Sequence, residues 1–384
     1  PLSLIKYLYN QCDVYPEEKI KVLANEFIAK CSKLTAIPKD LAMRTAGYIF
    51  THYKMEKDDK EGMKYVKEPL IKKTDEQLLT LANDLIFLVT GNEEANIYFD
   101  EGNYRILLDQ SKKTPFDIVT LFLTKKVKEY RLTLELYLDS TKRIPDRLNS
   151  MFSWINMTLT KLKEKNKAEY DKMKTDLSNN ICKIGKINVN EMYSLVNLWF
   201  QKEKKLILVK LEEDKQIQLQ YVEILIQKIN ASLEENENNI EEEEPGETAA
   251  VLKLHVQLLC DMKQTQKILP CLMKNPLYPL DDCLQLCLKN KVNDASIYLY
   301  QTTGDPTKAL KLSLELFTDV YTRIHNNLKL KSQLNENMHT LLLTEIQEKL
   351  AKCIEVCEHN EQQNDDLWFT LLDKLYASYG EISA

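Results

Sequence analysis

Two pairs of cysteines have a spacing that could support chemistry. Cys283 precedes Cys287, and Cys353 precedes Cys357, so each pair has the i, i+4 spacing that places both thiols on one side of a helix. Two such thiolates could supply half of a zinc site, which needs four converging ligands. His359 lies two residues after Cys357, and nothing in the sequence places a fourth ligand beside it. We therefore interpret both pairs as buried packing residues and expect no metal.

The remaining cysteines and histidines do not match the sequence motifs of known catalytic or metal-binding sites. The other cysteines are Cys12, Cys31, Cys182, Cys260 and Cys271, and the histidines are His52, His255, His325, His339 and His359. The 9 cysteines are odd in number, lie in apolar helical patterns and follow no secretory signal, which indicates small buried thiols in a reducing compartment. No HExxH, GxxxxGK[ST], GxGxxG or GxSxG sequence occurs. We expect no catalytic, metal-binding or cofactor-binding residue, no cofactor and no enzyme activity.

Three tryptophans offer a choice between packing and binding. Trp154, Trp199 and Trp368 each lie in an apolar context, within the sequences FSWI, NLWF and DLWF. We interpret them as anchors of a core. The alternative is a binding hot spot, because exposed tryptophan contributes a large share of interface energy. The acidic run Glu241–Glu244 has the same two interpretations, a loop first and a contact for a basic partner second.

Helices must position all of these residues. Apolar residues recur at steps of three and four in several long series, among them Leu148, Phe152, Ile155, Leu159 and Leu162, and Leu310, Leu314, Phe317, Tyr321, Ile324 and Leu328. The 384 residues include 8 glycines, where an average composition would give about 27. A sheet-rich or disulfide-stapled fold needs more of the tight turns that glycine supplies. The sequence predicts an all-α protein.

Proline and glycine residues, which interrupt helices, recur along the chain at intervals that would separate pairs of helices. Prolines punctuate it from Pro16 onward, and Gly304 to Pro306 form one of the later turns. Residues 54–73 are charged and weakly periodic, and residues 234–248 are acidic, so we expect loops or insertions at both places. No Gly/Ser linker separates two halves of different composition. We predict one continuous α-solenoid of antiparallel helix pairs over residues 1–384.

The charge distribution limits the possible partners and compartments. The formal net charge is −6, and residues 234–247 contain eight acidic residues and no basic one, so the rest of the chain is nearly neutral. No basic block suggests a nucleic-acid partner. No apolar run reaches the roughly 18–20 residues that span a bilayer. We expect a cytoplasmic protein, and a start at Pro1 instead of methionine leads us to expect a piece of a longer one.

Residues 279–328 show the repeating unit most clearly. We expect one short helix over Leu280–Lys289, ended by Asn290, and a second over Val292–Gln301. Gly304 suits a left-handed position after that second helix. Asp305 can then cap a third helix, and Pro306 can occupy its first turn because it loses no useful donor there.

Three segments resemble a known family. They are YPLDDCLQLCLKNKVNDASIYLYQTTGDPTKALKLSLEL (278–316), KKLILVKLEEDKQIQLQYVEILI (204–226) and DDLWFTLLDKLY (365–376). The first resembles a clathrin heavy-chain repeat of the vacuolar protein sorting subunits that form the CORVET and HOPS tethering complexes. The last is similar to a helix of the endosomal, CORVET-type subunit and favours it over the late-endosomal one. The three segments cover about a fifth of the chain.

This resemblance implies a scaffold on endosomes. Such subunits join class C core subunits, recognise Rab-type GTPases and hold membranes together before fusion. Many carry an N-terminal β-propeller and a C-terminal RING domain, which would both lie outside this chain. The resemblance therefore implies partners in a class C core, a Rab-type GTPase through the full-length protein, and the endosomal membrane indirectly. Two alternatives stay open: the partner-binding arm of a RING-type ubiquitin ligase, and a generic helical-repeat adaptor of the tetratricopeptide type.

Overall fold

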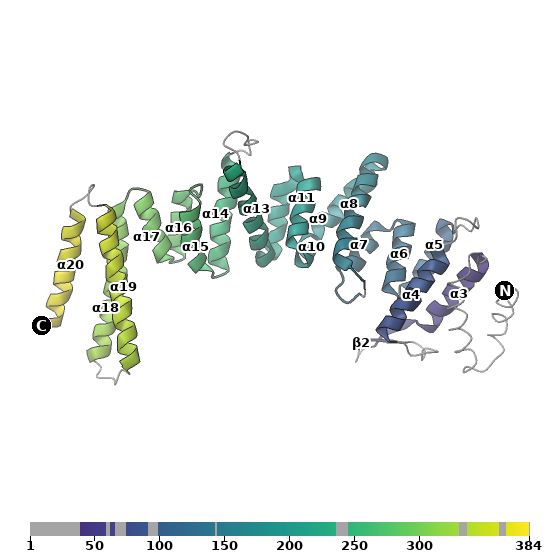
Figure 1. The fold of residues 1–384 in the computed structure, drawn as a ribbon, viewed down its shortest axis with the longest axis horizontal. Helices are drawn as coiled ribbons and strands as arrows, with labels where there is room; N and C mark the ends of the chain where they lie inside the picture. The colour runs from purple at the N-terminus through teal and green to yellow at the C-terminus, as the bar shows by residue number, and fades with distance from the viewer. Residues whose placement is uncertain are drawn as a thin grey trace. The chain divides into compact units, whose positions relative to one another are not determined.

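A computed structural model describes residues 39–58, 62–65, 74–90, 99–142, 144–235, 245–329, 336–360 and 366–383. The described residues are almost entirely helical (Figure 1), as the sequence predicts. The chain divides into two compact units, Pro1–Gln201 (unit 1) and Lys202–Ala384 (unit 2). Each unit is considered separately below.

Unit 1 is a series of helices that pack on their neighbours along the chain. The described helices are α3 (Lys39–His52), α4 (Asp75–Thr90), α5 (Glu101–Ser111), α6 (Asp117–Val127), α7 (Tyr130–Leu138), α8 (Arg147–Lys165), α9 (Lys167–Asn179), α10 (Ile181–Ile187) and α11 (Val189–Trp199). The main contacts join helices one or two places apart, such as α5 with α6, α4 with α6, and α8 with α9. A helix in such a series buries its apolar stripe against its neighbours.

Polar side chains fix where several of these helices begin. The carboxylate of Asp100 accepts a hydrogen bond from the backbone N–H of Asn103 at the start of α5. Asn166 and Asn188 do the same for α9 and α11, each accepting from the backbone N–H three residues later. These caps satisfy donors that the first turn of a helix leaves unpaired. They explain how α8 and α9 can be separated by a single residue.

A core of unit 1 is built on aromatic packing between the end of α3 and the α5–α6 region. The ring of Phe116 lies 5.3 Å from that of Tyr53 in an edge-on contact and 6.2 Å from that of Phe50, centroid to centroid. All three side chains are buried, together with Leu85 of α4 and Leu107 of α5. Edge-on and tilted aromatic pairs add stabilisation beyond the apolar area that they bury.

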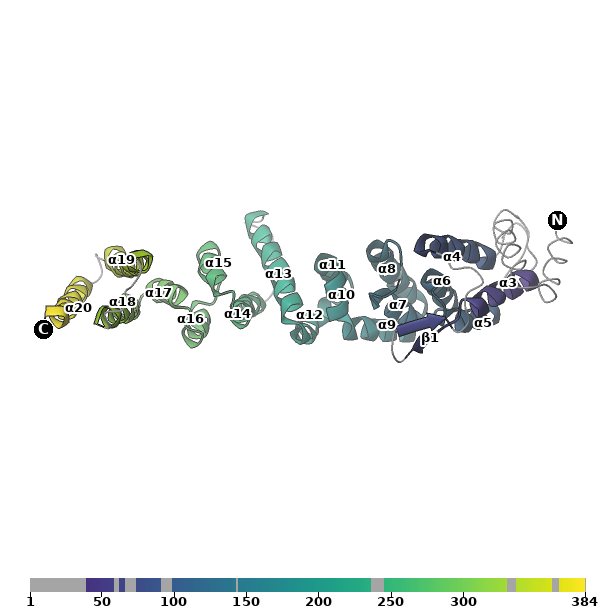
Figure 2. The same ribbon diagram turned by 90° about the horizontal axis from the view of Figure 1, so that it is seen from below.

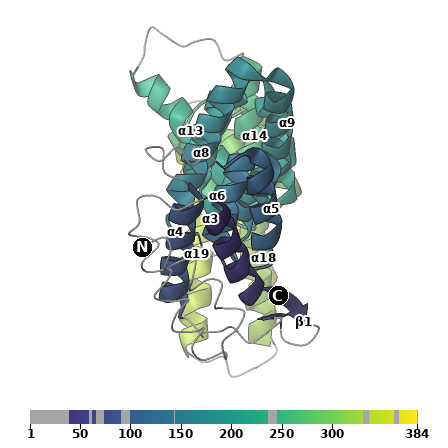
Figure 3. The ribbon, with the colours of Figure 1, turned by 90° about the vertical axis from the view of Figure 1, so that its right-hand side faces the viewer.

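A short β-hairpin is an exception to the helical expectation. Strands β1 (Met55–Asp58) and β2 (Gly62–Tyr65) pair antiparallel with Met55 opposite Tyr65, directly after α3 (Figure 3). The backbone N–H of Met55 donates to the carbonyl of Lys113, 2.6 Å away, which fastens the hairpin to the α5–α6 turn. The hairpin lies within residues 54–73, where we expect a loop or insertion. Its four-residue strands are too short and too charged to show the alternating pattern by which strands are recognised.

Unit 2 continues with helices of similar kind. Its helices are α12 (Lys204–Lys210), α13 (Lys215–Glu235), α14 (Pro245–Asp261), α15 (Ile268–Lys274), α16 (Leu280–Lys289), α17 (Asn293–Thr302), α18 (Pro306–Lys329), α19 (Glu336–His359) and α20 (Asp366–Ser383), with short 3-10 turns at Leu211–Glu213 and Thr265–Lys267. A third 3-10 turn, Gln201–Glu203, begins at the last residue of unit 1. Again the main contacts join near neighbours: α16 with α17, α17 with α18, and α18 with α19. Figure 2 shows α18 and α19 side by side.

The turn before α18 follows the sequence prediction closely. Gly304 has a φ of +80°, the left-handed conformation that favours glycine. The side chain of Asp305 accepts a hydrogen bond from the backbone N–H of Lys308, and Pro306 is the first residue of α18. The predicted helix over Leu280–Lys289 is confirmed, and the next helix, Asn293–Thr302, begins and ends one residue later than predicted.

The acidic segment at 234–248 is described only at its two edges. α13 extends to Glu235 and α14 begins at Pro245, so both edges are helical. Glu241–Glu244 lies outside the described residues. None of the helices in the described ranges combines the length and the hydropathy that a bilayer crossing requires.

Candidate functional site

Both cysteine pairs face the interior of unit 2. Cys283 and Cys287 on α16 are fully buried in a core that α13, α14 and α17 complete. Burial raises the pKa of both thiols to about 12, and raises the pKa of Cys353 on α19 to about 12 as well. Metal ligation and nucleophilic attack both require the thiolate. These thiols are therefore protonated at neutral pH and act as small apolar side chains.

Among the described residues, no side chain is placed to complete a metal site at the second pair. His359 is exposed, and its Nδ1 lies 2.8 Å from the carbonyl oxygen of Glu355 on its own helix. Cys357 is buried on the opposite side, against α18 and α20. Within the described ranges, no group of three or more His, Cys, Asp or Glu side chains has an arrangement that could hold a metal ion.

A buried histidine in unit 2 makes a polar contact that sequence reasoning did not single out. Nδ1 of His255 on α14 is 2.7 Å from the hydroxyl of Tyr278, and both side chains are buried. Burial lowers the pKa of His255 to about 4, and the positive charge of Lys267 adds to this effect. Burial also raises the pKa of Tyr278. The pair is uncharged at neutral pH, so it satisfies a polar group within a core. The side chains of His52, His325 and His339 lie outside the described ones.

The tryptophans pack within their units. Trp154 is buried on α8, with its ring 5.7 Å from that of Tyr137. Trp199 is half-buried on α11 and donates its indole N–H to the side-chain oxygen of Asn156 at 2.9 Å. Trp368 is half-buried on α20 and packs against the core that α18 and α19 share with it. The structure agrees with the interpretation of these residues as anchors.

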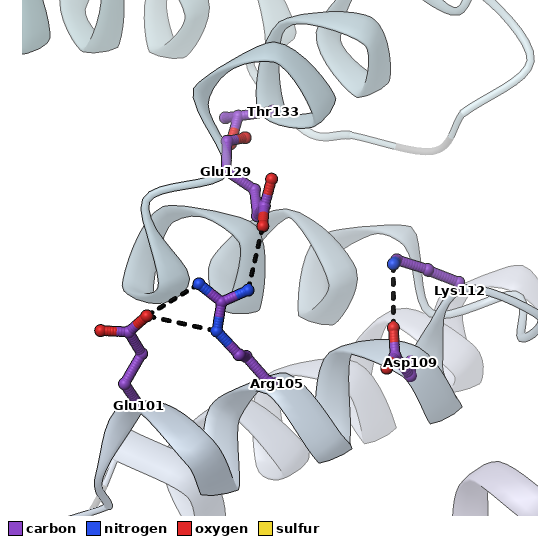
Figure 4. Close-up of polar contacts among 6 residues, drawn as sticks. All are labelled: Glu101, Arg105, Asp109, Lys112, Glu129 and Thr133. Atoms are coloured by element: carbon purple, nitrogen blue, oxygen red, sulfur yellow. Dashed lines mark hydrogen bonds and ion pairs between the residues drawn. The ribbon is translucent and has the colours of Figure 1, made fainter. Parts of the chain in front are cut away.

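A polar network links α5 to the start of α7 in unit 1. Arg105 donates to the carboxylate of Glu101 at 2.8 Å and to that of Glu129 at 3.2 Å (Figure 4). Glu129 directly precedes α7, and its backbone carbonyl accepts a hydrogen bond from the Thr133 hydroxyl. The three charged side chains are about half exposed. Exposed ion pairs contribute little stability each, so this network adds little to the stability of unit 1.

Surface grooves occur in both units among the described residues. One, of about 540 Å³, lies between the start of α7 and α9 and is lined mostly by charged side chains of both signs, such as Arg131 and Asp176. The other, of about 460 Å³, lies between α18 and α20, with Leu310, Leu314 and Leu367 among its lining residues. The hydroxyls of Thr175, Thr318 and Thr370 in these grooves each donate to a carbonyl oxygen of their own helix, which is not the pairing of a nucleophile with a base that covalent catalysis uses.

The last helix, α20, presents a row of exposed apolar side chains that no charge or motif had indicated. Phe369, Leu372 and Tyr376 are 66%, 57% and 81% exposed, and their spacing places them along one side of the helix. We call these three residues the outer stripe. The sequence of α20 contained a signal for it, because apolar residues occur around more of the helix than one buried face requires.

Comparisons with known proteins give one curated relative. The chain is similar to the mouse protein named Vacuolar protein sorting-associated protein 8 homolog, with 22% identity over 294 residues. The match takes in 73% of this chain and 18% of the mouse protein, so the chain spans about a fifth of that relative's length. No family model and no solved structure matches the chain. The similarity confirms the predicted resemblance to this family of tethering subunits.

Proposed function

We propose that this chain is a scaffold segment of an endosomal membrane-tethering subunit. The similarity to the mouse protein over 73% of the chain is the observation that carries this proposal. The architecture supports it, because long helical segments in both units pack on their sequence neighbours. The buried, protonated thiols and the uncharged His255–Tyr278 pair also suit a structural role. The chain supports vesicle tethering and fusion by binding other proteins, without a catalytic step of its own.

The proposed architecture is an α-solenoid of the clathrin heavy-chain-repeat type that continues through both units. In a solenoid each helix pair contacts only its neighbours, so the chain can extend over a long distance and present its edges to partners. A compact protein of this length would have a radius of gyration of about 21 Å. Small-angle scattering of the whole chain should give a clearly larger value. A radius near the compact value would contradict a continuous solenoid.

The proposed partners are those of the family. They are the class C core subunits, a Rab-type GTPase through the full-length protein, and the endosomal membrane indirectly. The protein would then be cytoplasmic and peripheral on endosomes, within a CORVET-type complex. Nucleic acid is not among the proposed partners.

Cross-linked capture from cells tests the proposal. The tagged chain should recover class C core subunits together with Rab-positive endosomal membranes. Leu299→Asp provides the control, because Leu299 of α17 is fully buried in the core that α17 shares with α16, and a charge there disrupts the helix-pair packing. That variant should recover far less of the same proteins. Recovery of no trafficking protein by the unaltered chain would contradict the proposal.

A further inference from the structure

Residues 265–279 of unit 2 connect two helices that already contact each other. The segment consists of the 3-10 turn Thr265–Lys267, helix α15 and the connection at 275–279, and we call it the flap. The helices before and after it, α14 and α16, pack directly on one another. Figure 2 shows α15 above α14 and α16 in that view. The contact between α14 and α16 can therefore persist when the flap moves away from them.

The flap buries few apolar side chains. Three of them are buried, Ile268, Leu272 and Tyr278, whereas Met273 and Leu277 are exposed. The main contacts of α15 are with its own 3-10 turn and with α17. At 7 residues, α15 is too short to be stable as an isolated helix. A segment with few buried apolar contacts opens at a lower free energy than the domain around it.

Buried polar contacts fasten the end of the flap to α13 and α14. The side-chain amide of Asn275 donates to Oδ1 of Asn230 on α13 at 2.7 Å, and Oδ1 of Asn275 accepts from the backbone N–H of Leu277 at 2.9 Å. The hydroxyl of Tyr278 lies 2.7 Å from Nδ1 of His255 on α14. A buried polar group that loses its partner is unfavourable, so these contacts hold the flap in its closed position.

His255 is the group beneath the closed flap that a proton would charge. Burial lowers its pKa to about 4, and the positive charge of Lys267 adds to this effect. His255 belongs to α14, whereas Lys267 and Tyr278 lie near the two ends of the flap. A protonated His255 would be a buried cation that faces a second cation on the flap. Opening brings water to the imidazolium and separates the two charges, so it becomes easier as the pH falls.

The other titratable groups around this contact act on the tyrosine or balance each other. Lys253 of α14 and Asp282 of α16 form an ion pair. Burial raises the pKa of the Tyr278 hydroxyl, and three neighbours add to this increase: Cys271 of α15, Cys283 of α16 and Glu223 of α13. The tyrosine therefore stays protonated in acid, and His255 is the member of the contact that gains a charge.

We propose that the flap opens away from α13 and α14, ahead of the rest of unit 2, when His255 takes up a proton. The contact between α14 and α16 persists, and the opening uncovers Cys283, whose thiol lies close enough to Tyr278 to act on its hydroxyl. The proposal rests on unit 2 alone and does not depend on the tethering proposal. A failure of one therefore leaves the other standing.

Amide hydrogen exchange of the whole chain tests the proposal. Exchange is followed by mass spectrometry at about pH 7 and pH 5 and corrected for the intrinsic rates. A pKa of about 4 in the closed flap and the ordinary 6.5 in the open one predict that opening becomes about twentyfold more frequent at the lower pH. Peptides from residues 265–279 should show this acceleration, and those from α16 and α18 should not. An unchanged corrected rate in the flap, or equal acceleration in α16, would overturn the proposal.

Variants identify the groups responsible. His255→Phe should remove the acceleration. Tyr278→Phe keeps the histidine and loses its partner, so it should raise flap exchange at pH 7 roughly fivefold. Lys267→Gln leaves the core intact because Lys267 is exposed, and it should reduce the acceleration about twofold. Lys263→Gln makes the same change at an exposed site outside the flap and should have no effect. Equal acceleration in the two glutamine variants would contradict the role of Lys267.

Thiol labelling gives an independent measure of the opening. The probe is 4,4′-dithiodipyridine, a disulfide that reacts with thiols in mildly acidic solution. Cys283 should be labelled at least tenfold faster at pH 5 than at pH 7, relative to Cys353 and Cys357 of α19, which belong to a separate core cluster. Equal acceleration at all three thiols would indicate unfolding of the whole unit and would overturn the proposal.

Discussion

The inner face of α16 and the outer stripe of α20 carry the same sequence signal with opposite outcomes. Cys283 and Cys287 are four residues apart and completely buried, whereas Phe369, Leu372 and Tyr376 are separated by three and four residues and largely exposed. α16 has helices packed over its apolar face, and α20 has helices over one of its two faces. Helical spacing of apolar residues thus predicts that a face can be covered, and the surrounding fold decides whether it is buried or left exposed.

Two adjacent leucines of α20 should differ most in what their substitution by alanine does to the free energy of unfolding. Leu371 is 2% exposed and Leu372 is 57% exposed. Leu371→Ala should lower the free energy of unfolding by about 2–5 kcal/mol, because it removes buried methyl groups and leaves a cavity. Leu372→Ala should change it by less than about 0.5 kcal/mol. Denaturant unfolding of both variants measures the difference, and equal effects would show that the outer stripe is also part of the core.

The buried His255 makes the interior of unit 2 sensitive to acid. Its pKa is about 4 in the folded chain, below the usual value of 6.5, so the unfolded chain binds the proton first as the pH falls. The corresponding stability is complete above pH 6.5 and is lost progressively as the pH falls towards 4, by about 3 kcal/mol in total. Chemical unfolding across that range measures the loss.

A matched substitution isolates the contribution of this histidine. His255→Phe removes the titrating group and should flatten the pH dependence between 6.5 and 4. His359→Gln replaces an exposed histidine and should leave the dependence unchanged. An unchanged pH dependence in His255→Phe would mean that other groups account for the acid sensitivity.

Substitution of a cysteine on α16 should lower the free energy of unfolding less than the changes at Leu371 and His255. Cys283→Ser places a hydroxyl in an apolar core and should cost about 1–3 kcal/mol of unfolding free energy. A thiol reagent at pH 8 should leave Cys283 and Cys287 unmodified in the folded chain, since burial holds their pKa near 12. Mass spectrometry of the folded and unfolded chain measures this protection.

Metal analysis completes the test of these thiols. The purified chain should contain no stoichiometric zinc, and a chelator should leave its thermal midpoint unchanged, because the thiols pack against apolar side chains. A midpoint that falls with chelator would restore the metal-site interpretation of the cysteine pairs.

Local sequence signals predicted several elements residue by residue. The helix at Leu280–Lys289, the left-handed Gly304 and the cap at Asp305 all follow from short-range chemistry, which acts within a few residues of the chain. The hairpin at Met55–Tyr65 could not be predicted in this way, because its strands are charged and are held by a long-range hydrogen bond to Lys113. The His255–Tyr278 contact joins residues 23 positions apart and left no local trace.

The sequence by itself determined the helical class of this protein, the ends of the helices between Leu280 and Pro306 to within a residue, and its resemblance to tethering subunits. These depend on periodicity, capping and turn residues, which the order of the amino acids specifies directly. The tertiary structure decided which apolar faces are buried, because burial depends on the helices that pack from elsewhere in the chain. Leu371 and Leu372 are neighbours of the same residue type, and packing against α18 and α19 buries the first and leaves the second exposed.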